Sequence, residues 1–455
     1  MNTPVSQDTG LPYPRRIWAV VTVITSIILL VASTAAISLG LPVISDDLDI
    51  DAATAVWIVS AFQISLVVCI LPFSALGDML GHRRIYRSGI MIFTIGAALC
   101  AVSNDFGVLL AARALQGVGG AATVSVGSAV LRDIYPRSMV GTAVSINALT
   151  VAVAGGLGPI AGSLILSYAS WPLLFSVWIP VGLVAYLASA GLPDNEVGRG
   201  QMDVIGAIIN AVAFGALVLG VTQLGSRLDL AFSALAISTI AFVVLVIHVR
   251  GKPHSILPVD LLAMPGLRMA LMTSGLGFAT GAVIMTVFPF YLLRDIGVSK
   301  MEAGFVIAIW PTTAAVSAVL AGWMSDRIRP EILCFSGLLT LAICMLLIIS
   351  PIVGHSTKYI TFIMAVMGVG FGFFQAPNNR ILIVLPPRER RIRASGIQAT
   401  SREFGNAIGI GLAGLGFSLA VTGGAYIGLA AGAALAVLAT ILSAIRLNLG
   451  LWSDL

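Results

Sequence analysis

The sequence carries little charge for its length. Only 10% of its 455 residues are Asp, Glu, Lys or Arg, against roughly 25% in an ordinary soluble domain. Its residues are 58% hydrophobic, and its mean hydropathy is +1.02. So few charged side chains cannot cover the surface of a water-soluble globule. The composition therefore excludes a soluble protein and indicates that most of the chain is surrounded by lipid.

Cysteine and histidine are also scarce, with four of each. None of them lies at a CxxC, HExxH or other metal-ligand spacing. We therefore expect no metal site, no cofactor and no disulfide framework. The sequence also shows no nucleophile–base pair and no phosphate-binding loop, so an enzyme is not expected.

Long apolar runs, by contrast, are abundant. A helix needs roughly 20 apolar residues to cross a bilayer core of about 30 Å. Backbone polar groups must be paired within the bilayer, so continuous runs of this length are predicted to be helices. The sequence thus predicts an all-α integral membrane protein. Its fourteen predicted transmembrane helices lie at about 17–45, 55–76, 86–103, 107–131, 139–167, 171–192, 203–223, 229–249, 269–292, 302–324, 331–353, 358–379, 396–421 and 424–446.

The basic residues are distributed unevenly between the two sides of the membrane. If the amino terminus is cytoplasmic, the connections on that side hold 18 Lys and Arg residues and the outer connections hold four. Because cytoplasmic loops are enriched in Lys and Arg, both termini are predicted to be cytoplasmic. The net charge of +5 is then a consequence of topology, and no nucleic-acid partner is expected.

Two connections repeat one pattern. Asp78 follows the second run, between small residues and the cations Arg83 and Arg84, while Asp326 follows the tenth run and precedes Arg327. If 203–249 is an inserted helix pair, each pattern joins the second and third helices of a six-helix unit. Repeated halves of this kind are typical of transporters that rock about a midplane site. The predicted domains are six-helix bundles at 1–194 and 269–455, with two inserted helices in a linker at 195–268.

Asp78 and Asp326 are candidate gating residues, together with Arg83, Arg84 and Arg327. An Asp at a cytoplasmic helix end can face the positive amino-terminal end of a helix from the opposite half. A contact made only when the cytoplasmic mouth is closed would bias the equilibrium between access states. The alternative is a solvated loop charge beside a turn-forming glycine.

Charged residues inside the runs are candidate functional residues. Arg113 lies about two turns inside the fourth run, where a charge is costly and usually functional. It could hold a water chain, a backbone carbonyl or a substrate carboxylate, or it could reach the outer headgroups. Glu403 beside Arg402 is the one carboxylate placed well inside a run. It could carry a proton, or it could be neutralised by Arg402 or Arg380.

The fifth run contains a glycine-rich stretch around a proline, which predicts a hinge or a proton-tight seal. Pro159 removes a backbone hydrogen bond, and glycines allow a neighbouring helix to approach closely. The hinge candidates are Gly155, Gly158, Pro159 and Gly162, with glycine packing alone as the alternative. Polar and aromatic residues that could line a substrate cavity are Ser33, Trp57, Phe62, Gln63, Asn147, Trp310, Phe374, Gln375 and Asn378.

Several of these motifs resemble the major facilitator superfamily. They are Gly77-Asp78 through Arg83-Arg84, Arg113 with Gln116-Gly117, and Gly158-Pro159 with Gly162. The inserted pair and the stretch Tyr291–Gly304 are similar to the fourteen-helix drug:proton antiporter branch. The resemblance implies a major facilitator fold, with Arg113 as the proton-coupling arginine, Asp78 as the access gate and Gly158-Pro159 as the hinge. Ser33 stands where the first helix of the family usually has an acid, and a serine cannot carry a proton at physiological pH.

Taken with the resemblance, these features predict a multi-pass transporter of the bacterial inner membrane. We expect proton-coupled efflux of small amphipathic compounds by alternating access. The expected partners are a small-molecule substrate, protons and the lipid bilayer, and the protein is expected to be a monomer. Two alternatives stay open. One is a proton-independent facilitator or importer of a small metabolite, and the other is a non-transporting membrane sensor or complex subunit.

Overall fold

The computed structural model describes residues 10–136, 139–194, 203–224, 227–249, 263–350, 356–386, 391–420 and 423–450. All regular elements in these ranges are helices. Thirteen helical segments of this part of the chain are long and apolar enough to cross a membrane. The helix α15 (Arg391–Leu419) is a further long helix and completes the set of fourteen. The predicted all-α architecture is confirmed.

The first half of the chain folds into six crossing segments. These are α1 (Arg15–Asp47), α2 (Ala52–Leu80), α3 (His82–Ala101), α4 (Phe106–Ile134), α5 (Val140–Tyr168), and α6 (Leu173–Ser176) with α7 (Trp178–Ala188) and η2 (Ser189–Gly191). Asp51 caps α2 and Asp105 caps α4, because their side chains accept hydrogen bonds from the backbone N–H groups of Thr54 and Val108, respectively. Gly81 has φ +94° between α2 and α3. A side chain rarely adopts this conformation, which explains the glycine in the repeated motif.

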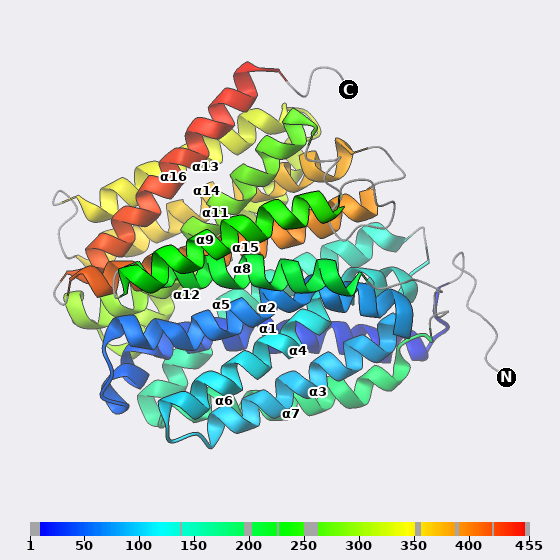
Figure 1. Ribbon diagram of the computed structural model, residues 1–455, viewed down its shortest axis with the longest axis horizontal. Coiled ribbons are helices and arrows are strands. Elements are labelled where there is room, and N and C mark those ends of the chain that lie inside the picture. Colours follow the sequence, from blue (N-terminus) through cyan, green and yellow to red (C-terminus); the bar gives the residue numbers. More distant parts are fainter. Residues whose placement is uncertain are drawn as a thin grey trace.

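The inserted pair consists of α8 (Val204–Gln223) and α9 (Leu228–Val249). Asp203 caps α8 through the Gly206 N–H and also contacts His248 near the end of α9. The helix α8 packs against both α2 and α15, and α9 lies outside it. Figure 1 shows the green pair in front of orange α15 and beside blue α2.

The second half of the chain forms the remaining six crossing segments. These are α11 (Pro265–Phe290) with η3 (Tyr291–Ile296), α12 (Lys300–Met324), α13 (Pro330–Ile349), α14 (Thr357–Val384), α15, and α16 (Gly424–Asn448). Pro265 and Pro330 lie in the first turns of α11 and α13. Proline costs least there because those N–H groups lack an intrahelical partner anyway.

Each half has its own apolar core, and the halves meet along three pairs of helices. One large cluster draws mainly on α1 to α7 and another mainly on α11 to α16. The contacts between halves are α5 with α12, α1 with α11, and α2 with α15. Glu403 and the glycine-rich segment of α5, described next, lie on these seams.

Candidate functional site

A carboxylate lies near the middle of α15, where this helix meets α2. Glu403 is about three turns inside α15, and its side chain is 12% exposed. The Nε2 of Gln63 on α2 donates to the backbone oxygen of Glu403 at 3.0 Å and to its Oε2 at 3.1 Å. The Nδ2 of Asn406 donates to the same Oε2 at 3.2 Å. The side-chain hydrogen bond from Gln63 thus joins the two halves of the molecule at Glu403, the acid that the sequence places well inside a run.

The two arginines considered as partners of Glu403 differ in the structure. The Nη2 of Arg402 is 3.5 Å from Oε1 of Glu403, and its guanidinium lies 5.3 Å from the centre of the Phe278 ring. Arg380 instead donates to Ser325 at 2.9 Å and to Asp326 at 2.7 Å. The donors at 3.0–3.2 Å from Glu403 are therefore neutral amides. Amide donors can serve either the ionised or the protonated carboxyl group.

Arg113 is fully buried between α2 and α4. Its Nε donates to the backbone oxygen of Ile58 at 3.0 Å, and its Nη1 donates to Oε1 of Gln116 at 2.8 Å. The guanidinium lies over the Phe62 ring, 4.6 Å from its centre. Within the described residues, its Nη2 has no partner. The sequence left a water chain, a backbone carbonyl and a substrate carboxylate open as partners of Arg113. In the structure, its side chain donates to a backbone carbonyl.

The helix α2 separates Arg113 from Glu403. Arg113 contacts Ile58 and Phe62, whereas Glu403 contacts the adjacent Gln63. The residues that contact Arg113 and the residue that contacts Glu403 therefore all belong to α2. A movement of α2 relative to α15 would change the surroundings of Glu403 while Arg113 stays within the first half.

At the helix ends that the sequence predicts to be cytoplasmic, the predicted gating charges bind within their own halves. Asp78 is 72% exposed, and its Oδ1 is 3.3 Å from Nε2 of His82. Asp326 pairs with Arg380, and Arg327 lies 4.2 Å from the centre of the Trp323 ring. Arg84 is exposed. The expected contact of Asp78 or Asp326 with a helix of the opposite half stays a prediction.

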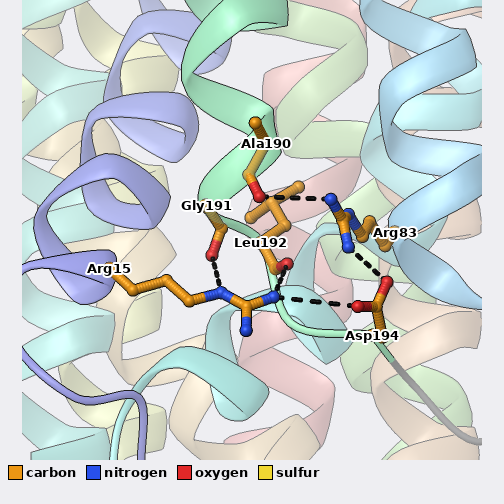
Figure 2. Close-up of polar contacts among 6 residues, drawn as sticks. All are labelled: Arg15, Arg83, Ala190, Gly191, Leu192 and Asp194. Atoms are coloured by element: carbon orange, nitrogen blue, oxygen red, sulfur yellow. Dashed lines mark hydrogen bonds and ion pairs between the residues drawn. The ribbon is translucent and has the colours of Figure 1, made fainter. Parts of the chain in front are cut away.

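Arg83 has a clear structural partner, the carboxyl end of the sixth crossing segment (Figure 2). Its Nη2 donates to the oxygen of Ala190 at 3.1 Å, and its Nη1 pairs with Asp194. Arg15 donates to the oxygens of Gly191 at 3.1 Å and Leu192 at 2.9 Å. The last carbonyls of a helix lack intrahelical donors, and their end of the helix dipole attracts cations. These contacts therefore tie α1, α3 and η2 together.

On the side that the sequence predicts to be outer, polar contacts cross from one half to the other. Arg294 on η3 donates to Ser45 at 3.1 Å and to Asp46 at 2.5 Å, both at the end of α1. The Nζ of Lys300 donates to the oxygen of Leu166 on α5 at 3.1 Å. Arg294 and Lys300 belong to the Tyr291–Gly304 stretch noted in the sequence. That stretch thus joins the outer ends of the two halves.

The glycine-rich segment of α5 contacts helices of both halves. A Cβ on Gly158 would meet Ala32 of α1, and one on Gly162 would meet Ala36. On another side, Gly155 lies against Pro311 of α12. Pro159 is inside α5, and its carbonyl faces Gly304 of α12. The hinge candidates therefore lie where α5 packs between α1 and α12.

Candidate cavity residues of the first half are in different surroundings. Ser33 is buried and donates to the carbonyl of Leu29 in its own helix, and Trp57 is half-buried. Phe62 packs edge-on to Phe93, with ring centres 6.2 Å apart. Asn147 lines a small cavity of about 10 Å³ between α1, α4 and α5.

In the second half, two of the candidates belong to one aromatic cluster. The Phe371 ring lies 5.1 Å from Trp310 and 5.8 Å from Phe374, measured between ring centres. Gln375 is half-buried. Asn378 is buried, with its amide donating to the oxygen of Ala270 at 3.1 Å. Phe374 and Asn378 therefore lie in the packed interior of this half.

Comparison with known proteins decides the family. The family profile described as Major Facilitator Superfamily matches residues 22–247 and 269–448. The chain belongs to the major facilitator superfamily. It is therefore a multi-pass membrane protein of a transporter family.

Relatives of this major facilitator protein include three named bacterial proteins. It is 35% identical to the uncharacterized transporter YebQ of Escherichia coli (strain K12), over 98% of each chain. It is 26% identical to the riboflavin transporter RibZ of Clostridioides difficile (strain 630), over 81% of each chain. It is 32% identical to MdtD of Escherichia coli (strain SMS-3-5 / SECEC), which carries a provisional multidrug-resistance name, over 53% of this chain and 52% of that one.

Solved structures share the fold of this major facilitator protein. A POT family transporter in complex with 5-aminolevulinic acid superposes with a TM-score of 0.74 at 15% identity, over 98% of each chain. A bacterial homologue of the lysosomal transporter Spinster superposes with a TM-score of 0.70 at 15% identity, over 96% of this chain and 98% of that one. Identity this low establishes the fold alone.

Three residues of this major facilitator protein gain importance only from the structure. Arg446 is buried and donates to Oδ1 of Asn378 at 2.8 Å, although the charge pattern placed it in a cytoplasmic connection. Asp194 joins Arg15 to Arg83, and Arg294 joins the two halves. No sequence spacing links these partners, because each contact connects different helices.

Proposed function

We propose that this major facilitator protein is a proton-coupled exporter of small amphipathic compounds. It works by alternating access in the bacterial inner membrane, as a monomer with both termini cytoplasmic. The moving bodies are residues 1–194 and 269–455, with residues 195–268 as the linker between them. The residues 195–202 and 250–262 of this linker lie outside the described ranges. The observation that carries the proposal is the Glu403 carboxyl group, which Gln63 holds across the α2–α15 seam.

Glu403 is proposed as the proton carrier because its protonation changes the contact between the halves. A hydrogen bond to an ionised carboxylate is roughly twice as strong as one between neutral groups. Protonation therefore weakens the donor contact from Gln63 and eases the separation of α2 from α15. Since α2 also contacts Arg113, the proton state of Glu403 is coupled to the position of the helix beside that arginine.

Amphipathic organic compounds are proposed as substrates because the candidate contact residues combine aromatic side chains with neutral polar ones. The relative named for riboflavin transport and the relative named for multidrug resistance support this chemical class. Trp310 is buried, and its indole N–H has no partner within the described residues. It is thus available as a donor to a polar group of the substrate. The other proposed contacts are Ser33, Trp57, Phe62, Gln63, Asn147, Phe374, Gln375 and Asn378.

Gating is proposed to use the repeated cytoplasmic motif. When the cytoplasmic side closes, Asp78 and Asp326 would approach helix ends of the opposite half, which favours that state through the helix dipole. Arg83, Arg84 and Arg327 support the two motifs. The segment from Gly155 to Gly162 around Pro159 accommodates the bending of α5 between α1 and α12.

The test is transport by the full chain in proteoliposomes under an imposed pH gradient, with cationic, neutral and anionic dyes. Wild type is compared with Glu403→Gln and Arg113→Ala, and Glu302→Gln is the control because Glu302 is an exposed acid at the outer end of α12. We expect gradient-driven movement that is lost in Glu403→Gln and retained in Glu302→Gln. Movement that needs no gradient and survives Glu403→Gln would contradict proton coupling and favour a facilitator. No movement together with a co-purifying partner would favour a sensor or complex subunit.

A further inference from the structure

The inserted helix α8 lies at the seam where α2 and α15 meet. Its buried residues include Ala207, Asn210, Phe214 and Val218, which follow one another at helical spacing and so share a face. From this face, the Phe214 ring lies 5.2 Å from the Phe404 ring on α15, measured between centres. Phe214 and Val218 also share an apolar cluster with Val67 of α2. The Asn210 face is therefore the face that contacts both halves.

Asn210 is the polar exception on this apolar face. It is completely buried, and within the described residues neither its amide nitrogen nor its amide oxygen has a hydrogen-bond partner. Leaving both groups of a buried amide unpaired costs free energy that an apolar side chain of the same size would not cost. A group of this kind requires a specific explanation. One explanation is that the Asn210 amide gains a partner in another conformational state of the protein.

The register of α8 against α15 shows where a partner lies. Phe214 is level with Phe404, and further along, Thr222 is level with Gly411, so the two helices run in the same direction. One turn back from Phe214 is Asn210, and one turn back from Phe404 is Thr400. Thr400 is buried, and Glu403 lies within one turn of it along α15. Asn210 is therefore level with the polar segment of α15 that carries Glu403.

We propose that Asn210 is the residue through which the inserted helix pair takes part in alternating access. Its amide is unpaired while the outer side is closed, and it gains a partner on the Thr400–Glu403 segment when α15 shifts against α8. The hydrogen bond formed there stabilises the outward-open state. Asn210 is thus a positioning residue, and this role rests on the alternating-access function proposed above.

The test measures how often the outer side opens, independently of any substrate. Ser163 is buried on α5 where Gly304 of α12 packs against it, so Ser163→Cys reports opening of this seam. The readout is the rate at which a membrane-impermeant maleimide, added outside spheroplasts, labels this cysteine in the full chain. Protein without the substitution gives the background. Asn210→Leu and Asn210→Ala remove the amide with different volumes.

We expect both variants to lower the labelling rate by about two- to tenfold, the range that the loss of one hydrogen bond produces. Asn210→Leu should also leave the Tm unchanged or raise it, because the unpaired amide is removed. Ser238→Ala is the matched control. It removes the bond from Ser238 of α9 to the Ala213 carbonyl of α8, and the labelling rate should not change.

Three results would overturn the role of Asn210. They are unchanged labelling in both variants, faster labelling in either variant, and a decrease in only one of them, which would indicate a volume effect. A Ser163→Cys protein that never reacts would contradict alternating access itself. Normal labelling without dependence on position 210 would contradict only this inference. The two failures are therefore distinguishable.

Discussion

The predicted outer and cytoplasmic ends of the molecule use their charged residues differently. At the outer end, Arg294 and Lys300 of the second half contact Asp46 and Leu166 of the first. At the cytoplasmic end, Arg83 pairs with Asp194 inside the first half and Arg380 pairs with Asp326 inside the second half. The outer contacts join the halves, and the cytoplasmic contacts make each half more rigid. This is the arrangement expected when two rigid bodies rock and the outer side is closed.

The outer seam, where α12 and η3 of the second half meet α1 and α5 of the first, also differs from the cytoplasmic contacts in the interactions that stabilise it. An exposed ion pair such as Arg294–Asp46 contributes only about 0.2–1 kcal/mol, because water competes for both partners. The close approach of Gly304 to Ser163 and to the Pro159 carbonyl depends instead on packing. Small residues let helix backbones approach in a membrane and gain dispersion energy along their length. Closure of the outer side therefore depends mainly on packing and less on charge.

The largest effect is expected from adding a side chain at that contact. In Gly304→Val, the new atoms would meet Ser163 and the Pro159 carbonyl, so the outer seam cannot close fully. We expect transport to fall at least about fivefold, since overpacking costs roughly 1–3 kcal/mol. The same variant should raise maleimide labelling of Ser163→Cys.

Gly322→Val is the matched control for this prediction. Gly322 lies on the same helix, and a Cβ there would meet no atom within 4 Å. Transport and labelling should stay near the wild-type values. Equal losses of transport in the two variants would show that α12 tolerates valine at neither position. The contact at Gly304 would then have no special role.

A smaller effect, of a different kind, is expected at the cytoplasmic end. Arg83→Ala removes the donor to the Ala190 carbonyl and the partner of Asp194. We expect the free energy of unfolding to fall by about 1 kcal/mol, seen as a lower Tm in detergent. Ser163→Cys labelling should not change, because the contact lies inside one half. A large change in labelling with an unchanged Tm would show that Arg83 acts between the halves instead.

Asp78→Asn should shift the access equilibrium modestly. Its proposed attraction to a helix end of the opposite half contributes about 0.3–1 kcal/mol to the cytoplasm-closed state. Loss of the charge should therefore reduce the rate of Ser163→Cys labelling about two- to fivefold. Faster labelling in this variant would contradict the proposed gate.

The smallest effect is expected from the exposed outer ion pair. Asp46→Arg should speed Ser163→Cys labelling by at most about fivefold, in line with the value of exposed pairs. Adding Arg294→Asp reverses both charges and should return the rate toward wild type. If the double variant labels as fast as the single one, the pair does not contribute to closure.

Much of the fold follows from the sequence because it depends on local properties. Apolar length predicts each helix, and the glycine between α2 and α3 predicts a turn that the structure shows with positive φ at Gly81. The same reasoning placed Glu403 and Arg113 inside helices. It could not identify Gln63 as the partner of Glu403, because the two residues are 340 positions apart and only the packing of α2 on α15 brings them together.

The sequence was least informative near helix ends and at contacts between helices. Arg446 lies in the last turn of α16, where a charge pattern cannot separate a solvated cation from a buried one. Its burial depends on Asn378 of α14, which supplies an acceptor from another helix. Asn210 is comparable, since its position in an apolar helix was evident but its place at the seam depends on how α8 packs.

The most direct test of the account is a pair of distance measurements by electron spin resonance in proteoliposomes. One pair of spin labels replaces Tyr168 and Glu302 at the outer ends of α5 and α12. The other replaces Leu80 at the cytoplasmic end of α2 and Ile328 in the connection that follows α12. All four side chains are exposed. When the pH is lowered to protonate Glu403, the account predicts that the outer distance lengthens while the cytoplasmic distance shortens, and that Glu403→Gln adopts this distribution at every pH. Distances that change together at both ends, or that ignore pH and Glu403→Gln, would contradict it.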